Sequence, residues 1–324
     1  MESVNAIVVG GGPCGLATAI ALQNIGVSSI IIEKGNVVEA IYKYPTHQTF
    51  FSTSEKLAIG DVPFIIEGRK PKRNQALVYY REVAKMKKLQ VHRYETVERV
   101  EKQKDSFVVY TSKSTYKTAN VIIATGYYDH PNLLGIPGEE LPKVSHYFKE
   151  GHPYFDTDVV VIGGKNSSID AALELHKAGA RVTVVYRGSE YSSSIKPWIL
   201  PEFEGLVRSG EINMLFDSHV EVITHEEVRI RQHENMVDIK NDFVFAMIGY
   251  HPDHNFLKNM GVQIDDLSGR PLINESTMES NIENLYIAGV LAAGNNANEI
   301  FIENGRFHGE LIANSIMQKE KLPK

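Results

Sequence analysis

The single cysteine of the chain, Cys14, lies inside a glycine-rich segment that runs Gly10-Gly11-Gly12-Pro13-Cys14-Gly15. A chain with one cysteine cannot form an internal dithiol, so this thiol either reacts alone or does no chemistry. The GxGxxG spacing is typical of a turn that presents backbone N–H groups to a pyrophosphate at the start of a helix. The segment therefore predicts a nucleotide site with Cys14 on the first turn of its helix.

The elements on either side of this segment fit a dinucleotide-binding unit. Residues 4–9 form an apolar run typical of a buried parallel strand, and 13–24 predict a helix that begins at a proline. A second strand, 29–32, ends at Glu33, eighteen residues after Gly15, where an acid can bind a ribose hydroxyl pair. In this first site we expect binding by Gly10, Gly12, Pro13, Cys14, Gly15, Glu33 and Lys34.

The same pattern returns near the middle of the chain. Residues 159–168 read VVVIGGKNSS, followed by a predicted helix through Ala178 and a strand over 182–186. Gly10 corresponds to Gly163, and Glu33 then corresponds to Tyr186. We expect a second nucleotide there, bound by Gly163, Gly164, Lys165, Asn166, Ser167, Ser168, Tyr186 and Arg187.

The second copy differs from the first in ways that bear on its nucleotide. Tyr186 removes the carboxylate that would repel a 2′-phosphate and Arg187 supplies a cation, which favours NADP(H) over NAD(H). A solvated charge at a strand end is the alternative interpretation of Arg187. Lys165 and Ser168 replace small residues of the fingerprint, so we expect looser packing and hindered backbone approach there.

Two apolar segments that end in glycine, 121–126 and 244–249, predict two chain crossings between domains. The expected fold is α/β, with two Rossmann-like three-layer dinucleotide-binding domains and the second inserted in the first. The predicted boundaries are 1–126 and 249–324 for the first domain and 127–248 for the second. A final helix is expected over about 298–318.

Composition narrows the class of protein. The 324 residues carry 43% hydrophobic and 23% charged residues, a balance typical of a soluble globular protein. A net charge of −6 argues against nonspecific nucleic-acid binding, and no stretch has the length of a membrane span. Neither an export signal nor a disulfide framework is indicated, so we expect a cytoplasmic protein. No metal site is expected, and the oligomeric state is left open.

The whole chain resembles the flavoprotein superfamily that contains thioredoxin reductases and flavin monooxygenases, and within it the YpdA-type bacillithiol disulfide reductases. The resemblance rests on the first glycine turn with its cysteine, on 163–167, on YPTHQTFF at 44–51, and on AGV at 288–290 with NNANEI at 295–300. It implies FAD at the first repeat, NADPH at the second, and reduction of a low-molecular-weight disulfide through Cys14. Further FAD contacts implied are Gln48, Thr49, Thr125, Gly126, Gly289, Ala297, Glu299 and Ile300. Val290 stands where relatives often carry an aspartate that contacts the flavin side chain.

Three alternatives stay open from the residues alone. Cys14 is either catalytic or a small packing residue, and an ionised thiol needs help from a positive group such as Lys43 or His47. The enzyme could use another acceptor, such as oxygen, a quinone or ferredoxin, since 61–64 and 145–147 echo flavin monooxygenases. A non-catalytic redox sensor that binds flavin and NADP(H) is the alternative from another class.

Overall fold

The computed structural model describes residues 2–296 and 298–321. The chain divides into two compact units, Met1–His130 with His251–Lys324, and Pro131–Tyr250. The second unit is therefore inserted between two parts of the first. The predicted boundaries lay at 126 and 248.

The first unit is built on a nine-stranded sheet, in the order β15-β16-β17-β6-β1-β2-β3, with β5 beside β6 and β4 beside β5. Strands β17, β6, β1, β2 and β3 are parallel. Strand β6 changes partners along its length, because its first half pairs with β5 and its last three residues pair with β17. The bounds are β1 Glu2–Val9, β2 Ser29–Glu33, β3 Val91–Arg93, β4 Val97–Lys102, β5 Phe107–Thr111, β6 Thr115–Ile123, β15 Ile273–Asn274, β16 Glu279–Ser280 and β17 Leu285–Ile287.

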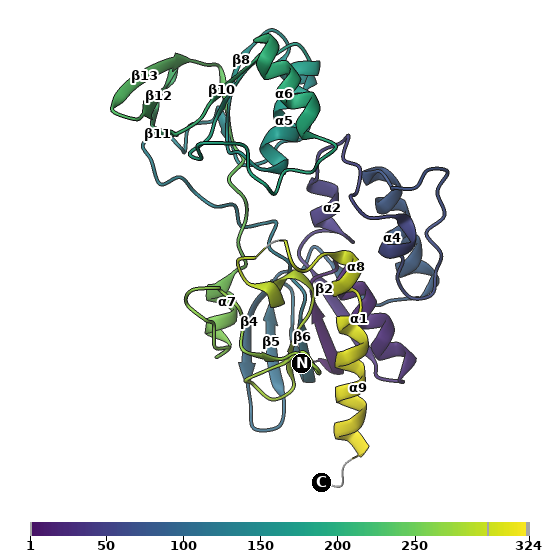
Figure 1. Cartoon of the computed structure of the whole chain (residues 1–324). Helices are drawn as coiled ribbons and strands as arrows, with labels where there is room; N and C mark the ends of the chain where they lie inside the picture. The colour runs from purple at the N-terminus through teal and green to yellow at the C-terminus, as the bar shows by residue number, and fades with distance from the viewer. Residues whose placement is uncertain (1, 297, 322–324) are drawn as a thin grey trace. The chain divides into compact units, whose positions relative to one another are not determined.

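The first helix of this unit lies between the sheet and the last helix. It starts at Pro13, has Gly12 as its N-cap, and buries its residues from Gly15 to Leu22 on all sides. A helix that is apolar all round must be covered all round, and α9 lies alongside it (Figure 1). The helices are α1 Pro13–Asn24, α2 Glu39–Lys43, α3 Ser54–Leu57, α4 Arg73–Met86, α7 His254–Asn259, η2 Gly289–Ala293, α8 Ile302–Gly305 and α9 His308–Lys321.

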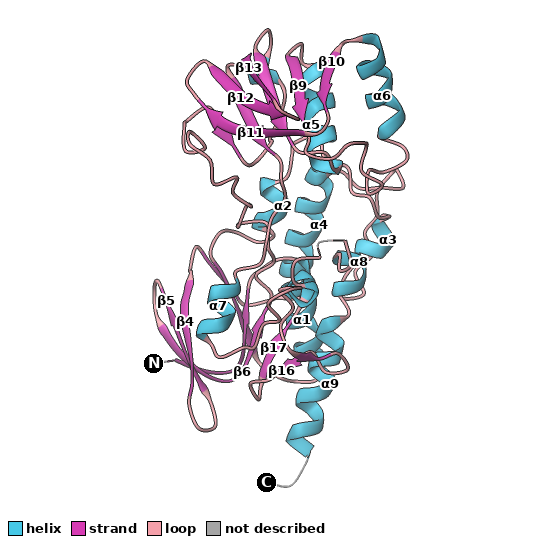
Figure 2. Cartoon of the chain, turned by 60° about the vertical axis from the view of Figure 1, so that its left-hand side comes forward, coloured by secondary structure: helices cyan, strands magenta, loops and turns pink. Residues whose placement is uncertain are grey.

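The second unit contains a five-stranded parallel sheet in the order β10-β9-β8-β14-β7. Three further strands form an antiparallel sheet of their own, which Figure 2 shows in magenta as β11, β12 and β13. The bounds are β7 Val144–Ser145, β8 Asp158–Ile162, β9 Arg181–Val185, β10 Ile212–Leu215, β11 Ser218–Ile223, β12 Glu227–Gln232, β13 Asn235–Lys240, β14 Phe243–Ala246, η1 His152–Tyr154, α5 Asn166–Lys177 and α6 Leu200–Ser209.

These two units confirm the predicted α/β class with two Rossmann-like domains. The expectation of one final helix over about 298–318 was wrong, because the structure has a short α8 and a separate α9. The Asn304 side chain accepts from the Phe301 N–H and donates to the Glu299 carbonyl, which starts α8 at Ile302. The chain then turns at 306–307, and Gly309 packs so closely on α1 that a β-carbon there would lie 2.6 Å from the Thr18 Cα.

Candidate active site

The first glycine turn is shaped by two contacts that exclude side chains. Gly10 has φ +107°, and a β-carbon there would lie 2.5 Å from the Ala124 carbonyl oxygen. A β-carbon at Gly15 would lie 2.0 Å from the Gly10 carbonyl oxygen. Gly10 is therefore required for the close approach of the turn to the residues that follow β6, and Gly15 for the close approach of α1 to the turn.

This turn fits the pyrophosphate of a dinucleotide. The backbone N–H groups of Gly12, Cys14 and Gly15 have no acceptor among the residues that the structure describes. A β-carbon at Gly12 would meet nothing within 4 Å, so the turn is open on that side. Unpaired donors at the start of a twelve-residue helix attract an anion through both hydrogen bonds and the helix dipole.

Glu33 lies at the end of β2 and is 6% exposed. Its carboxylate accepts from the Gly11 N–H at 2.6 Å and from the Gly35 N–H at 2.7 Å. Burial raises the pKa of Glu33, although these two hydrogen bonds oppose the shift. Each carboxylate oxygen keeps a second acceptor site, so a ribose hydroxyl pair can still bind. The adjacent Lys34 ammonium pairs with Asp129 at 3.0 Å.

The second turn repeats the geometry of the first with one exchange of side chain. The Gly163 N–H donates to the Val185 carbonyl at 2.9 Å, as the Gly10 N–H does to the Ile32 carbonyl. Where Glu33 contacts Gly11, the ring of Tyr186 lies against Gly164, and a β-carbon at Gly164 would lie 2.3 Å from that ring. Tyr186 therefore occupies the place of the ribose-binding acid and blocks a carboxylate from it.

The two departures at Lys165 and Ser168 do not loosen the second turn. Ser168 is fully buried, and its hydroxyl accepts from the Lys165 N–H and donates to the Lys165 carbonyl. A serine thus replaces glycine without an unsatisfied group. The Asn166 side chain accepts from the Lys196 N–H at 2.8 Å and donates to the Ser194 carbonyl at 2.9 Å, so it anchors that loop. Ser167 is exposed on the first turn of α5.

Arg187 follows Tyr186 at the end of β9. It is exposed and makes no hydrogen bond or ion pair with any residue that the structure describes. A guanidinium without a protein partner, next to a glycine turn that lacks its acid, suits a 2′-phosphate. The prediction that Arg187 binds the nucleotide stays a prediction.

The Cys14 sulfur faces two glycines near the C-terminal end of the chain. A β-carbon at Gly289 or at Gly305 would lie 3.1 Å from this sulfur, and one at Gly305 would also lie 3.1 Å from the Ile300 side chain. The absence of side chains at Gly289 and Gly305 therefore makes the space that the thiol fills. Cys14 as a residue is half-buried, but its thiol is enclosed.

This enclosure controls the ionisation of the thiol. Burial raises the pKa of Cys14 to about 12, and no neighbouring charge opposes it. The ammonium of Lys43, one of the two groups expected to help, pairs with Asp129 at 2.6 Å. The thiol is therefore neutral at physiological pH in the structure described here, and a reaction through it requires a change in its surroundings.

This ionisation can be measured directly because Cys14 is the only cysteine. In flavin-free protein, we expect its alkylation by iodoacetamide to rise about tenfold per pH unit from about pH 7 to about pH 10. The thiolate fraction grows over that whole range when the pKa is about 12. A plateau near pH 9, as in unfolded protein, would contradict this result.

The other residues expected to contact FAD lie in three places. Thr125 and Gly126 follow β6 next to the first turn, and a β-carbon at Gly10 would lie 3.1 Å from the Thr125 Cα. Gln48 donates its amide to the Thr49 carbonyl, and Thr49 bridges to Lys72. These contacts fix the local backbone and leave the predicted role of Gln48 and Thr49 as a prediction.

The third group belongs to the loop before α8. The Glu299 carboxylate pairs with Arg270 and accepts from the Asn296 amide at 3.1 Å, so it fastens this loop to the turn at 265–270. Ile300 lies beside the enclosed thiol. Ala297 lies outside the described residues.

Sequence reasoning missed one side chain in this region. His308 accepts the Gly289 N–H at its Nδ1 atom, 3.1 Å away. A single histidine near the start of a predicted helix carries no motif, and only its position in the fold reveals this contact.

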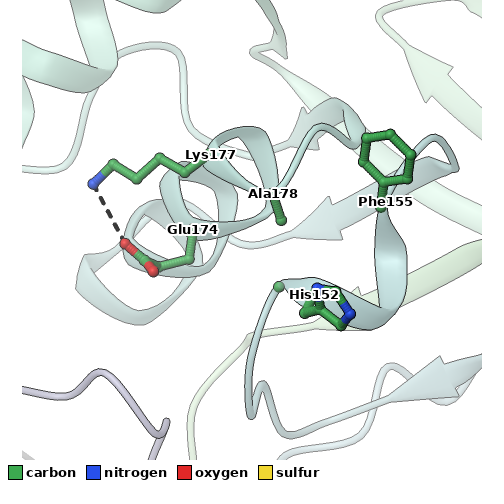
Figure 3. A pocket seen from close by; sticks show the side chains of 6 residues that line it. His152, Phe155, Glu174, Lys177 and Ala178 are labelled. Atoms are coloured by element: carbon green, nitrogen blue, oxygen red, sulfur yellow. Dashed lines mark hydrogen bonds and ion pairs between the residues drawn. The ribbon is translucent and has the colours of Figure 1, made fainter.

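The second unit also has a pocket of about 460 Å³ near the C-terminal end of α5 (Figure 3). The Glu174 carboxylate and the Lys177 ammonium at its edge pair with each other at 3.3 Å. None of its lining residues is a predicted site residue; they are Gly151, His152, Phe155, Glu174, Lys177 and Ala178. Within residues 2–296 and 298–321, no group of three potential ligands could hold a metal ion. Among the helices in those ranges, none is long and apolar enough to cross a bilayer.

Two glycine turns, each between a parallel strand and a helix, define a protein with two dinucleotide sites. The sequence pattern of the family described as pyridine nucleotide-disulphide oxidoreductase matches residues 7–289. The chain is 68% identical over 322 residues to the bacilliredoxin reductase Bdr of Bacillus subtilis, covering 99% of each chain.

Two solved structures are similar over the full length. The bacillithiol disulfide reductase Bdr (YpdA) from Staphylococcus aureus is 58% identical, with a TM-score of 0.97 over 99% of this chain and 100% of that one. The protein of the same description from Bacillus cereus is 63% identical, with a TM-score of 0.97 over 98% and 100%.

The chain belongs to the pyridine nucleotide-disulphide oxidoreductase family. It is an oxidoreductase, and the family implies FAD and NADPH as its cofactors. The resemblance to YpdA-type reductases, the enzyme class and the two cofactors are confirmed. The unpaired N–H groups and the open face at Gly12 fit such a cofactor at the first turn.

Proposed function

We propose that this protein uses NADPH and FAD to reduce a low-molecular-weight disulfide, bacillithiol disulfide, to two thiols. The observation that carries the proposal is the position of the one cysteine, on the first turn of α1 beside a dinucleotide-binding turn. The names of the full-length relatives support the choice of substrate. Bound FAD supplies a redox centre that accepts a hydride and delivers two electrons to sulfur.

The two units divide the binding work. The unit Met1–His130 with His251–Lys324 holds FAD, with the Gly12, Cys14 and Gly15 N–H groups on the pyrophosphate and Glu33 on the adenosine ribose. The unit Pro131–Tyr250 holds NADPH at its own turn, with Arg187 on the 2′-phosphate. We further propose that the protein works in the cytoplasm. A homo-oligomer is also possible for this chain, and measurement of its molecular mass in solution tests that.

Cys14 is the proposed carrier of the reaction. Its thiolate attacks one sulfur of the substrate, so that a Cys14–sulfur bond forms, the substrate disulfide breaks and one thiolate leaves. Two electrons that originate in NADPH, together with a proton, then break this mixed disulfide. The second thiol leaves and Cys14 returns to its thiolate. Since burial keeps the resting thiol neutral, the first step needs the enclosure of Cys14 to open or its charge environment to change.

An acceptor comparison tests the function. Purified flavin-loaded protein is mixed with NADPH and, separately, bacillithiol disulfide, oxygen alone, a quinone or ferredoxin, and NADPH loss is followed. We expect multiple turnovers with the disulfide and slow loss with the others. Full-rate oxidation with oxygen alone would identify an oxidase or monooxygenase. Negligible turnover with every acceptor would favour a redox sensor.

A second candidate acceptor is a protein disulfide. The relative from Bacillus subtilis is described as a bacilliredoxin reductase, which names a protein and not a small molecule. Bacilliredoxin in mixed disulfide with bacillithiol is therefore tested beside the free disulfide. A preference for the protein substrate by more than about tenfold in kcat/KM would place that acceptor first.

The choice of nicotinamide cofactor rests on Arg187. Replacing it with glutamate is expected to raise the KM for NADPH by about 10²-fold while NADH is affected little, because a bidentate contact with a 2′-phosphate becomes a repulsion. Steady-state kinetics with both cofactors measure this ratio. Arg208→Glu, at an exposed arginine on α6 of the same unit, is the matched control and is expected to leave the ratio unchanged. Equal effects on the KM values for NADPH and NADH would show that Arg187 does not bind the 2′-phosphate.

A further inference from the structure

His308, the first residue of α9, is bonded to the peptide that covers the Cys14 thiol. The Gly289 N–H donates to His308 Nδ1 at 3.1 Å. Because an amide N–H can only donate, Nδ1 must be the unprotonated ring nitrogen, and the ring proton of the neutral imidazole lies on Nε2. The bond therefore exists only while His308 is neutral.

Gly289 has a backbone conformation and a close contact that only a glycine accommodates. Its φ is +75°, and a β-carbon there would lie 3.1 Å from both Cβ and Sγ of Cys14. This peptide therefore forms one wall of the thiol enclosure, with Gly305 as another. His308 is the one side chain bonded to the Gly289 N–H in the part of the chain that the structure describes.

We propose that His308 is a positioning residue that keeps the Gly289 peptide closed over the Cys14 thiol, and that protonation of its imidazole opens this enclosure. The inference rests on the proposed function only where it treats Cys14 as the thiol that reacts with the substrate. Protonated Nδ1 becomes a donor that faces the Gly289 N–H, so the hydrogen bond is replaced by a contact between two donors.

The surroundings of His308 determine the pH at which its imidazole takes up a proton. Its pKa is lowered by burial. The titratable groups on α1, on α8, in the turn that follows and on the first turns of α9 are Cys14, Glu303, Arg306 and Glu310. Lys319, near the other end of α9, pairs with Glu279. Glu303 accepts from Ser52 and Arg306 donates to the Ala58 carbonyl, and neither contributes to the shift.

The lowered pKa of His308 fixes the direction in which stability changes with pH. An unfolded histidine takes up its proton near pH 6.5, whereas His308 in the folded protein takes it up at a lower pH. The contribution of the Gly289 bond to stability is therefore fully present above about pH 6.5 and is lost as the pH falls through the folded pKa. Acid thus opens the enclosure, and neutral pH closes it.

The test measures access to the thiol and not enzyme activity. Flavin-loaded protein without NADPH is treated with 4,4′-dithiodipyridine, a probe that reacts with thiols in acid as well as at neutral pH, and the adduct is followed by mass. Because Cys14 is the only cysteine, each adduct reports on this site. The variants are His308→Asn, whose Oδ1 can accept the Gly289 N–H at any pH, and His308→Leu, which has no acceptor.

At about pH 7.5 we expect wild-type protein and His308→Asn to react within about twofold of each other. As the pH is lowered stepwise from about 7.5 to the lowest pH at which the protein stays folded, we expect the wild type to come to react at least about fivefold faster than His308→Asn, since only the wild type loses its acceptor. The His308→Leu variant is expected to react with the probe faster than His308→Asn, by a similar factor at both ends of the pH range. His219→Leu, an exposed histidine of the other unit, is the matched control and should follow the wild type.

Two results would overturn the proposal. One is a wild-type to His308→Asn ratio that is the same at both ends of the pH range, and the other is equal reactivity of His308→Leu and His308→Asn. Should His308→Leu not fold, the ratio of wild type to His308→Asn decides alone. Because no substrate or NADPH is present, a failure of the disulfide reductase function leaves this measurement intact, and a flat ratio leaves that function intact.

Discussion

Replacing Gly15 with alanine is expected to destroy the first nucleotide site. The new β-carbon would lie 2.0 Å from the Gly10 carbonyl oxygen, a backbone atom that cannot rotate away. Helix α1 would have to move off the strand below it, at a cost of about 3 kcal/mol or more. For a domain of this size we expect the melting temperature to fall by about 6–10 °C and the flavin content of purified protein to fall below about a tenth.

Gly12→Ala is the matched control for this change. A β-carbon at Gly12 would meet nothing within 4 Å, and Gly12 has an ordinary φ of −73°. We therefore expect Gly12→Ala to melt within about 2 °C of the wild type, and to lose flavin only through crowding of the pyrophosphate. Calorimetry and the ratio of flavin to protein absorbance measure both effects. A melting temperature for Gly15→Ala equal to that of Gly12→Ala would contradict the packing argument.

Replacing Cys14 with alanine is expected to lower disulfide-dependent NADPH oxidation by about 10³-fold or more. The carrier of the proposed covalent step is removed, and the chain has no second thiol to replace it. Flavin content and NADPH affinity should stay close to those of the wild type. The change in free energy of unfolding should be about 1 kcal/mol, the cost of removing one buried sulfur.

The same variant supplies its own control. A small one-electron dye that accepts electrons directly from the reduced cofactor should be reduced by Cys14→Ala as fast as by the wild type. Loss of both activities would indicate a damaged cofactor site. Full disulfide turnover by Cys14→Ala would assign Cys14 a packing role, which its enclosure between Gly289 and Gly305 would then explain.

Local signals in the sequence are strong for the elements around the two turns. The predicted helix over 13–24 is α1 with the same bounds, and the predicted strands around it and in the second copy agree with β1, β2, β8 and β9 to within two residues. These segments depend on short-range patterns, namely an apolar run, a glycine turn and an apolar helix. The internal repeat also related Glu33 to Tyr186 correctly, because equal spacing between matched glycines reflects equal element lengths.

Such patterns do not predict which partners a side chain contacts in the folded protein. No spacing indicates that Glu299 pairs with Arg270 or that Asn166 anchors the loop at 194–196. The looser packing expected at Ser168 is absent from the structure, because its hydroxyl is satisfied within its own turn. Each of these outcomes depends on which groups compete for a hydrogen bond after the chain has folded.

The amino-acid sequence by itself determined that this protein has two dinucleotide-binding repeats, that one lacks its acid, and that a single thiol lies in the other. Those features depend on residues close together in the chain. Only the tertiary structure decided what surrounds the thiol, because Gly289 and Gly305 reach Cys14 from the far end of the chain and His308 bonds to the Gly289 N–H. Burial among these residues raises the pKa of Cys14, and burial is a property of packing that no local pattern contains.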